Sequence, residues 1–197
     1  RMGGMPMLPG PVAVKDAEDQ AIEEGWADEK QPDAKSEEDI DSSWEDAIIA
    51  SIAKPISPSG ASNSTAVPGG RLTVIQPKDD AATVRSITRE NEAAQTIARS
   101  GYIIEQQPKV EGRKKPDYRI EGEIFDCYVP MEGTRARNIR SNINRKVVED
   151  QAKRIVLNLD DWTGTEAEVL KALQAEPVSG LEQVLVVKGG KVYSIFP

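Results

Sequence analysis

The sequence predicts an α/β fold in which helices flank a mixed sheet, preceded by a largely irregular acidic segment. Two passages in the C-terminal part run from strand to helix to strand, an order that favours a sheet covered by helices. One strand candidate, residues 154–159, is apolar through Ile155, Val156 and Leu157, as is typical of a strand buried on both faces. Charge is uneven, because residues 1–70 hold 5 Lys and Arg against 14 Asp and Glu, whereas residues 71–197 hold 20 against 19.

Residues 1–70 are interpreted as an acidic, Pro- and Ser-rich segment or linker, and residues 71–197 as the folded domain. Three prolines and a Ser/Thr run between residues 55 and 70 are typical of a linker. Residues 43–52 have the pattern of a short amphipathic helix with a capping start, too short to be stable alone. The Arg at position 1 suggests a fragment of a longer polypeptide.

The elements of the domain follow from apolar periodicity and from turn residues. A helix over residues 86–100 is expected to end at Gly101, because glycine tolerates the left-handed backbone that closes many helices. In chain order, the other predicted elements are a strand at 102–105, a basic loop at 109–115, a hairpin at 117–128, a helix at 137–153, a strand at 154–159, a helix at 165–175, and a last hairpin with strands 181–187 and 191–196 about Gly189-Gly190.

The hairpin at 117–128 carries the sharpest chemical signal. A two-residue turn at Glu121-Gly122 would place Asp117 directly opposite Asp126, with Cβ atoms about 5 Å apart. Two carboxylates that close repel each other unless a proton or a cation lies between them. A three-residue turn would instead put them on opposite faces, and acids near a turn can also simply be solvated.

Helical phase adds Glu90 and Lys146 to this pair. Glu90 falls within the apolar stripe that contains Ile87 and Ala94, and Lys146 shares a helix face with Ile139. A carboxylate on a buried stripe is costly unless it is paired or binds a metal. The alternatives are that Glu90 interacts with the helix dipole and that Lys146 extends to solvent.

Composition limits the chemistry. The chain has no histidine and one cysteine, Cys127, which excludes a Cys/His zinc site and an internal disulfide and leaves proton transfer to Asp, Glu, Lys or Tyr. No apolar run is long enough to cross a bilayer. Carboxylates that hold Mg²⁺, with a nearby lysine, suit phosphodiester hydrolysis. Candidate phosphate contacts are Arg113, Lys114, Lys115, Arg135, Arg137 and Arg140, and Tyr128 is either a base-stacking or a core residue.

The order of these residues resembles that of the PD-(D/E)xK nucleases. It departs from that pattern after Asp126, where Cys127-Tyr128 stands in place of the expected lysine, so Lys146 would have to replace it. More widely, residues 84–197 resemble the C-terminal toxin domain of contact-dependent growth inhibition proteins, in the tRNA nuclease subgroup with a restriction-endonuclease-like fold. The resemblance rests on Arg89-Glu90-Asn91-Glu92-Ala93-Ala94, Gly101-Tyr102, Lys115-Pro116-Asp117-Tyr118, Ile120-Glu121-Gly122, Phe125-Asp126-Cys127-Tyr128 and Gln151-Ala152-Lys153-Arg154-Ile155-Val156-Leu157-Asn158-Leu159.

This resemblance implies a metal-dependent endonuclease toxin that cleaves tRNA in a target bacterial cell. It implies catalytic roles for Glu90, Asp117, Asp126 and Lys146, with the three acids as ligands of a divalent ion, Mg²⁺ first and Zn²⁺ or Mn²⁺ as alternatives. It further implies a cognate immunity protein, secretion or delivery from the cell surface, action in the target-cell cytoplasm and no stable membrane insertion, and leaves the oligomeric state undetermined. The alternatives are a DNase toxin on the same scaffold and a non-enzymatic domain of a phage or secretion structure.

Overall fold

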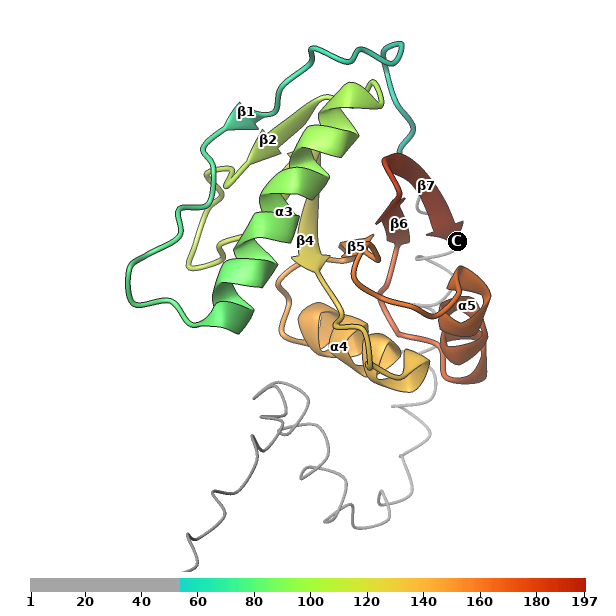
Figure 1. Cartoon of the computed structure of the whole chain (residues 1–197). Helices are drawn as coiled ribbons and strands as arrows, with labels where there is room; N and C mark the ends of the chain where they lie inside the picture. Colours follow the sequence, from blue (N-terminus) through green and yellow to red (C-terminus); the bar gives the residue numbers. More distant parts are fainter. Residues whose placement is uncertain (1–53) are drawn as a thin grey trace, which may run out of the picture. The chain divides into compact units, whose positions relative to one another are not determined.

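A seven-stranded sheet organises residues 54–197, the part of the chain that this computed structural model describes (Figure 1). The strands lie side by side in chain order, and three neighbouring pairs are parallel whereas three are antiparallel. They are β1 (Gly69–Gly70), β2 (Ile104–Gln106), β3 (Tyr118–Ile120), β4 (Glu123–Tyr128), β5 (Arg154–Asn158), β6 (Gln183–Lys188) and β7 (Lys191–Phe196). The predicted α/β class with a mixed sheet is confirmed.

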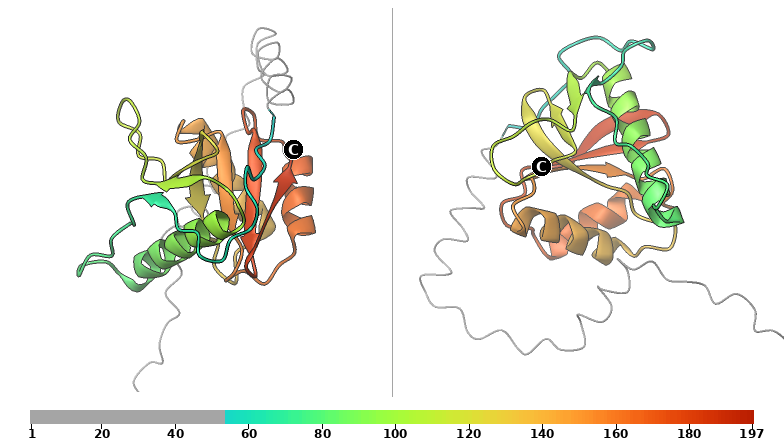
Figure 2. Two further views of the ribbon diagram at one scale, coloured as in Figure 1. Left: turned by 90° about the horizontal axis from the view of Figure 1, so that it is seen from above. Right: turned by 90° about the vertical axis from the view of Figure 1, so that its left-hand side faces the viewer.

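Helices cover both faces of this sheet and form the crossovers between its parallel strands. Helix α3 (Ala81–Arg99) joins β1 to β2, α4 (Ala136–Val148) joins β4 to β5, and α5 (Glu166–Ala175) joins β5 to β6. Figure 2 shows α3 on one face and α5 on the other. No helix among residues 54–197 is both long and apolar enough to span a membrane.

Alternation along the central strands divides the core into two layers. Val156 packs with α3 residues in one apolar cluster, whereas its neighbours Ile155 and Leu157 pack with α4 and α5 residues in the other. Every residue of β5 is buried, as expected for a strand that contacts helices on both faces. The apolar run seen in the sequence therefore serves two cores at once.

Helix α3 begins earlier than predicted and ends where predicted. The Asp80 carboxylate accepts a hydrogen bond from the Thr83 amide at 2.8 Å, so an N-cap allows the helix to start at Ala81 rather than at residue 86. At the other end, the amides of Gly101 and Tyr102 donate to carbonyls of the last turn, in a Schellman arrangement. Gly101 has a φ of +92°, a value that requires glycine there.

Helix α4 ends at Val148, whereas the sequence predicted helix to residue 153. Asp150 takes a left-handed φ of +55°, and the amide of Gln151 donates to the Lys146 carbonyl at 3.0 Å. This turn brings the chain into the sheet as β5 directly afterwards. The polar pattern of residues 149–153 was compatible with either helix or turn, and the position of β5 decided it.

Residues 54–70 differ from their interpretation as a linker, because they pack against the domain. The amide of Ile56 donates to the Gln183 side chain at 3.0 Å, the Gly60 amide donates to the Gly101 carbonyl at 3.0 Å, and β1 pairs with β2. Backbone groups make these contacts, and a Pro/Ser-rich composition does not reveal them. The predicted helix at 43–52 lies outside the described residues, and the interpretation of residues 1–53 stays a prediction.

Candidate active site

The β3–β4 hairpin has the register on which the pairing of its two aspartates depends. Glu121 and Gly122 both adopt positive φ, +48° and +87°, as a two-residue hairpin turn requires. The strands pair Ile120 with Glu123 and Tyr118 with Phe125. One step further along the same register places Asp117 opposite Asp126, so the two-residue turn is confirmed and the three-residue alternative is wrong.

Long-range contacts to the Glu121 side chain hold the turn in place. Its Oε1 accepts hydrogen bonds from the Ile103 amide at 2.8 Å and from both the amide and hydroxyl of Ser59, at 3.1 and 2.9 Å. These bonds lower the pKa of Glu121 against the opposing effect of burial. The hairpin is therefore anchored by Ile103, the residue before β2, and by Ser59 of the 54–70 segment.

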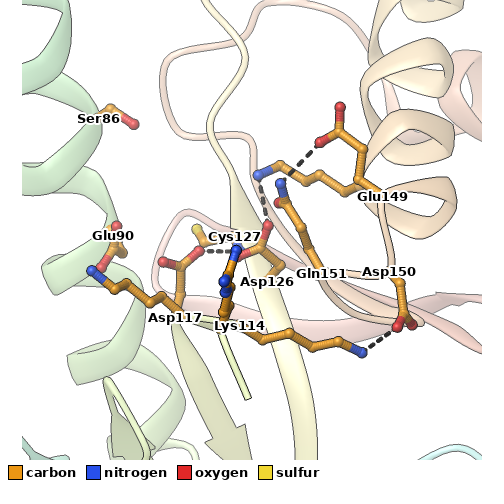
Figure 3. Close-up of a pocket in the computed structure, with 12 residues that line it drawn as sticks. Ser86, Glu90, Lys114, Asp117, Asp126, Cys127, Glu149, Asp150 and Gln151 are labelled. Carbon is orange, nitrogen blue, oxygen red and sulfur yellow. Dashed lines mark hydrogen bonds and ion pairs between the residues drawn. The ribbon is translucent and has the colours of Figure 1, made fainter. Parts of the chain in front are cut away.

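An open cleft of about 620 Å³ brings together all four residues predicted from the sequence (Figure 3). Glu90 comes from α3, Asp117 precedes β3, Asp126 lies within β4 and Lys146 lies in the last turn of α4. The remaining lining residues are Ser86, Arg113, Lys114, Lys115, Cys127, Glu149, Asp150 and Gln151. Helix α3, the β3–β4 hairpin and helix α4 thus converge on one concave surface, the usual form of a ligand site.

Asp126 and Lys146 form a partly buried ion pair in this cleft. The Lys146 Nζ donates to Asp126 Oδ2 at 2.7 Å, and the side chains are 17% and 6% exposed. Burial by itself lowers the pKa of the Lys146 ammonium, but the charge and hydrogen bond of Asp126 outweigh burial and raise it. Lys146 is therefore a cation at neutral pH, directed at the acidic pair.

Asp117 is the most strongly perturbed acid of the site. Its Oδ2 accepts the Cys127 amide at 2.7 Å, which fixes the carboxyl beside β4. Burial, followed by the hydrogen bond and charge of Asp126 and the charge of Glu90, raises the pKa of Asp117 to about 9. Without a divalent ion in the cleft, Asp117 therefore keeps its proton at neutral pH, as one of two carboxyls sharing a site does.

Glu90 faces the same cleft from α3 and is held from two sides. Burial raises its pKa, a hydrogen bond from the Thr73 hydroxyl opposes this, and the charge of Asp126 raises it further. The Tyr118 hydroxyl donates to the Glu90 carbonyl at 2.6 Å and fixes the helix turn that carries the side chain. Strongly perturbed acids in a cleft are typical of functional sites.

The donor chemistry fits a hard divalent cation. Glu90, Asp117 and Asp126 offer only oxygen ligands, and the raised pKa values of Glu90 and Asp117, to which the charge of Asp126 contributes, show that a cation would relieve the repulsion between these acids. Within the described residues, however, no three Asp, Glu, Cys or His side chains are close enough together to hold an ion as they stand. The observed core of the site is the Asp117–Asp126 pair with Lys146.

Two of the candidate substrate contacts have structural roles instead. Arg140 donates to the carbonyls of Glu176 and Pro177 at 2.8 and 3.2 Å and joins α4 to the end of α5. Tyr128 is 8% exposed, and its hydroxyl accepts from the Asn142 amide at 3.0 Å, so it is a core residue. Cys127 is also buried, as expected for a small core residue.

The basic loop at residues 109–115 lies next to the acids, although one of its lysines, Lys114, is held in an ion pair. Arg113, Lys114 and Lys115 line the cleft, and Lys114 forms an ion pair with Asp150 across it (Figure 3). Arg135 and Arg137 are exposed at the start of α4, at the other end of the helix from Lys146. The loop, and not the start of α4, is therefore the basic surface next to the acids.

Sequence reasoning missed several lining residues. Ser86 lies one helical turn before Glu90 and was visible in the helical phase. The contribution of residues 149–151 required the early end of α4. Thr73 is not one of the residues that line the cleft, but its hydroxyl bonds the Glu90 carboxylate there, a contact that depends on the tertiary structure.

Comparisons with known proteins identify the family of this domain. The family model described as contact-dependent growth inhibition CdiA C-terminal domain matches residues 114–192. A solved CdiA-CT/CdiI toxin and immunity complex from Burkholderia pseudomallei contains a chain that is 39% identical, with a TM-score of 0.62, and the match covers 66% of this chain and 99% of that one. The chain belongs to the CdiA C-terminal domain family.

A curated relative extends the match of this CdiA C-terminal domain over the whole chain. The tRNA nuclease CdiA-2 of Burkholderia pseudomallei strain 1026b is 35% identical over 199 residues, which is 99% of this chain. The match covers 6% of the length of that relative. The family model includes Asp117, Asp126 and Lys146, whereas Glu90 lies before its first matched residue.

Proposed function

We propose that this CdiA C-terminal domain is a metal-dependent ribonuclease toxin that cleaves tRNA in the cytoplasm of a target bacterial cell. The observation that carries the proposal is the convergence of Glu90, Asp117, Asp126 and Lys146 in one open cleft beside a basic loop. The name of the curated relative, a tRNA nuclease, supports RNA rather than DNA as the substrate.

The three acids would hold the divalent ion, with Mg²⁺ as first choice and Mn²⁺ or Zn²⁺ as alternatives. Such an ion, when bound, lowers the pKa of a water and offsets the charge that develops on the phosphate. Asp117 and Asp126 would supply the central pair of oxygens, and Glu90 would approach from α3. Asp117 must lose its proton for this, so ion binding is expected to strengthen as pH rises towards about 9.

Lys146 and the basic loop would act on the phosphates. The Lys146 ammonium, held against Asp126, is positioned to stabilise negative charge on the reacting phosphate, where a fixed cation in a partly buried site is most effective. Arg113 and Lys115 at the rim would hold neighbouring phosphates without reading sequence. These contacts would make binding sensitive to salt.

A cognate immunity protein and delivery between cells complete the proposal. The solved relative is a toxin and immunity complex, which supports a partner of this kind. An acidic protein surface that meets the basic loop would block the cleft, since complementary charge favours rapid and specific association.

Incubating the domain with tRNA and with plasmid DNA, in Mg²⁺ and in EDTA, tests the proposal. We expect the parent domain to cut tRNA in Mg²⁺ and not in EDTA. Glu90→Gln should lose this activity. Glu92→Gln should retain it, because Glu92 lies exposed on another face of the same helix. Cleavage of DNA alone would favour the DNase alternative. If neither substrate is cut under any of these conditions, the proposal is wrong and a non-enzymatic role gains.

A further inference from the structure

The segment that precedes α3 contacts the cleft through Thr73, whose hydroxyl bonds the Glu90 carboxylate. Residues 71–76 form no helix or strand, and Leu72 and Val74 are 64% and 66% exposed. Thr73, between them, is instead fixed at both backbone groups by one side chain. Its amide donates to Asn91 Oδ1 at 3.2 Å, and its carbonyl accepts from Asn91 Nδ2 at 3.0 Å.

The clamp made by Asn91 is itself oriented. Gln106, in β2, donates from Nε2 to Asn91 Oδ1 at 2.9 Å, which is consistent with the amide orientation that the Thr73 backbone needs. Asn91 follows Glu90 directly in α3. The same helix turn therefore carries both the acid of the cleft and the side chain that holds Thr73 beside it.

The hydroxyl of Thr73 has one direction left in which to donate. Gln107 donates from Nε2 to Thr73 Oγ1 at 2.8 Å and occupies the acceptor side of the hydroxyl. A hydroxyl has a single proton, and that of Thr73 is given to Glu90 Oε1. Among side chains of this size, only Thr and Ser can accept and donate in this manner.

Gln107 also connects this arrangement to the second acid. The backbone amide of Gln107 donates to the backbone carbonyl of Asp117 at 2.8 Å, and Gln107 adopts a left-handed φ of +48°. A non-glycine residue in this region is unusual, and such strain often persists where surrounding contacts require it. Gln107 thus fixes the Thr73 hydroxyl and the backbone of Asp117 together.

We infer that Thr73 is a positioning residue, which holds the Glu90 carboxylate at the α3 wall of the cleft, where it would serve the proposed divalent-ion site. The inference rests on the proposed function. A glutamate has three side-chain torsions, and a carboxylate without a fixed donor samples several orientations. Hydrogen-bond partners of metal ligands restrict this freedom, and their loss typically lowers metal affinity or activity by about 10- to 100-fold.

The test compares Thr73→Val with Thr73→Ser. Thr73→Val keeps the size of the side chain and removes the hydroxyl, and we expect kcat on tRNA to fall about 10- to 100-fold while KM changes less than about twofold. Titration with Mn²⁺ alone, followed by calorimetry, should show a weaker affinity of similar size. Thr73→Ser should restore both to within about threefold, which a purely structural role of the residue would not predict.

Two further variants separate positioning from general loss of structure. Thr88→Val removes another α3 hydroxyl, one that bonds the Val84 carbonyl, and should leave kcat and Mn²⁺ affinity unchanged. Asn91→Ala releases the clamp and should weaken both, and combining it with Thr73→Val should add little, because the two act through one contact.

The outcomes distinguish this inference from the function on which it rests. If the parent domain cuts tRNA and Thr73→Val retains parental kcat and Mn²⁺ affinity, positioning by Thr73 is wrong and the proposed function stands. Equal losses in Thr73→Ser and Thr73→Val would also overturn it. If the parent neither cuts nucleic acid nor binds Mn²⁺, both the function and the inference are wrong.

Discussion

Replacing Asp117 by asparagine should stabilise the fold while abolishing cleavage. The asparagine mimics the protonated acid, because its oxygen can accept the Cys127 amide and its NH₂ group can donate to Asp126. On folding of the parent, the pKa of Asp117 rises from its ordinary value of 3.8 to about 9, so the folded protein keeps a proton there that the unfolded chain would lose. At about pH 7.5 this sets an upper limit of about 5 kcal/mol on the destabilisation, at about 1.4 kcal/mol per pH unit.

We expect a gain of about 2 kcal/mol in the free energy of unfolding, below this limit, since the cleft is open and water partly solvates a carboxylate there. The sign follows from proton linkage. Between about pH 4 and 9 the folded parent binds more protons than the unfolded chain, so its stability falls as pH rises. The variant lacks this group, and its advantage should be near zero at about pH 4, grow with pH and level off above about pH 9.

Urea unfolding of both proteins from about pH 5 to 9, without divalent ions, measures the difference. Mg²⁺ or Mn²⁺ should then stabilise the parent and not the variant, because ligand binding to the folded state alone raises stability. Asp117→Ala is the control, since it also removes the titrating group but leaves the Cys127 amide without its acceptor, and it should be about 1–3 kcal/mol less stable than Asp117→Asn. A variant advantage that does not change with pH would refute the assigned proton.

Three other tests, which use five substitutions in all, concern separate parts of the structure. Gly101→Ala should lower the free energy of unfolding by about 2–4 kcal/mol in a thermal melt, because φ is +92° and a Cβ would lie 2.2 Å from a backbone oxygen. Lys146→Met should abolish cleavage and destabilise by about 3 kcal/mol, since it leaves a buried carboxylate unpaired, whereas Lys153→Met at an exposed position should do neither. Arg113→Ala should weaken tRNA binding and reduce the slope of the logarithm of the binding constant against the logarithm of salt concentration by about one. Arg140→Ala should lower stability with little effect on binding. Filter binding at several salt concentrations and urea titration measure these last two.

Local signals made much of the fold predictable. The hairpin turn followed from Glu121-Gly122 and the end of α3 from Gly101, and the helix predicted at 165–175 begins at a capping box of Thr165 and Glu168. In each case a backbone requirement is met by residues next to one another in the chain. Errors arose where the deciding contact was distant, as at the end of α4 and in the 54–70 segment.

The sequence by itself determined the faces on which the site residues lie. Given a two-residue turn at Glu121-Gly122, a strand period of two sets Asp117 and Asp126 on one face. A helix period of 3.6 turns Glu90 and Lys146 inward, since side-chain direction follows local backbone geometry. The tertiary structure alone decided how these side chains are charged and held. Burial between α3 and the sheet raises the pKa of Asp117, and Thr73, 17 residues before Glu90, reaches its carboxylate because of folding and not periodicity. Desolvation and hydrogen bonding depend on atoms brought together from distant parts of the chain, and no local pattern encodes them.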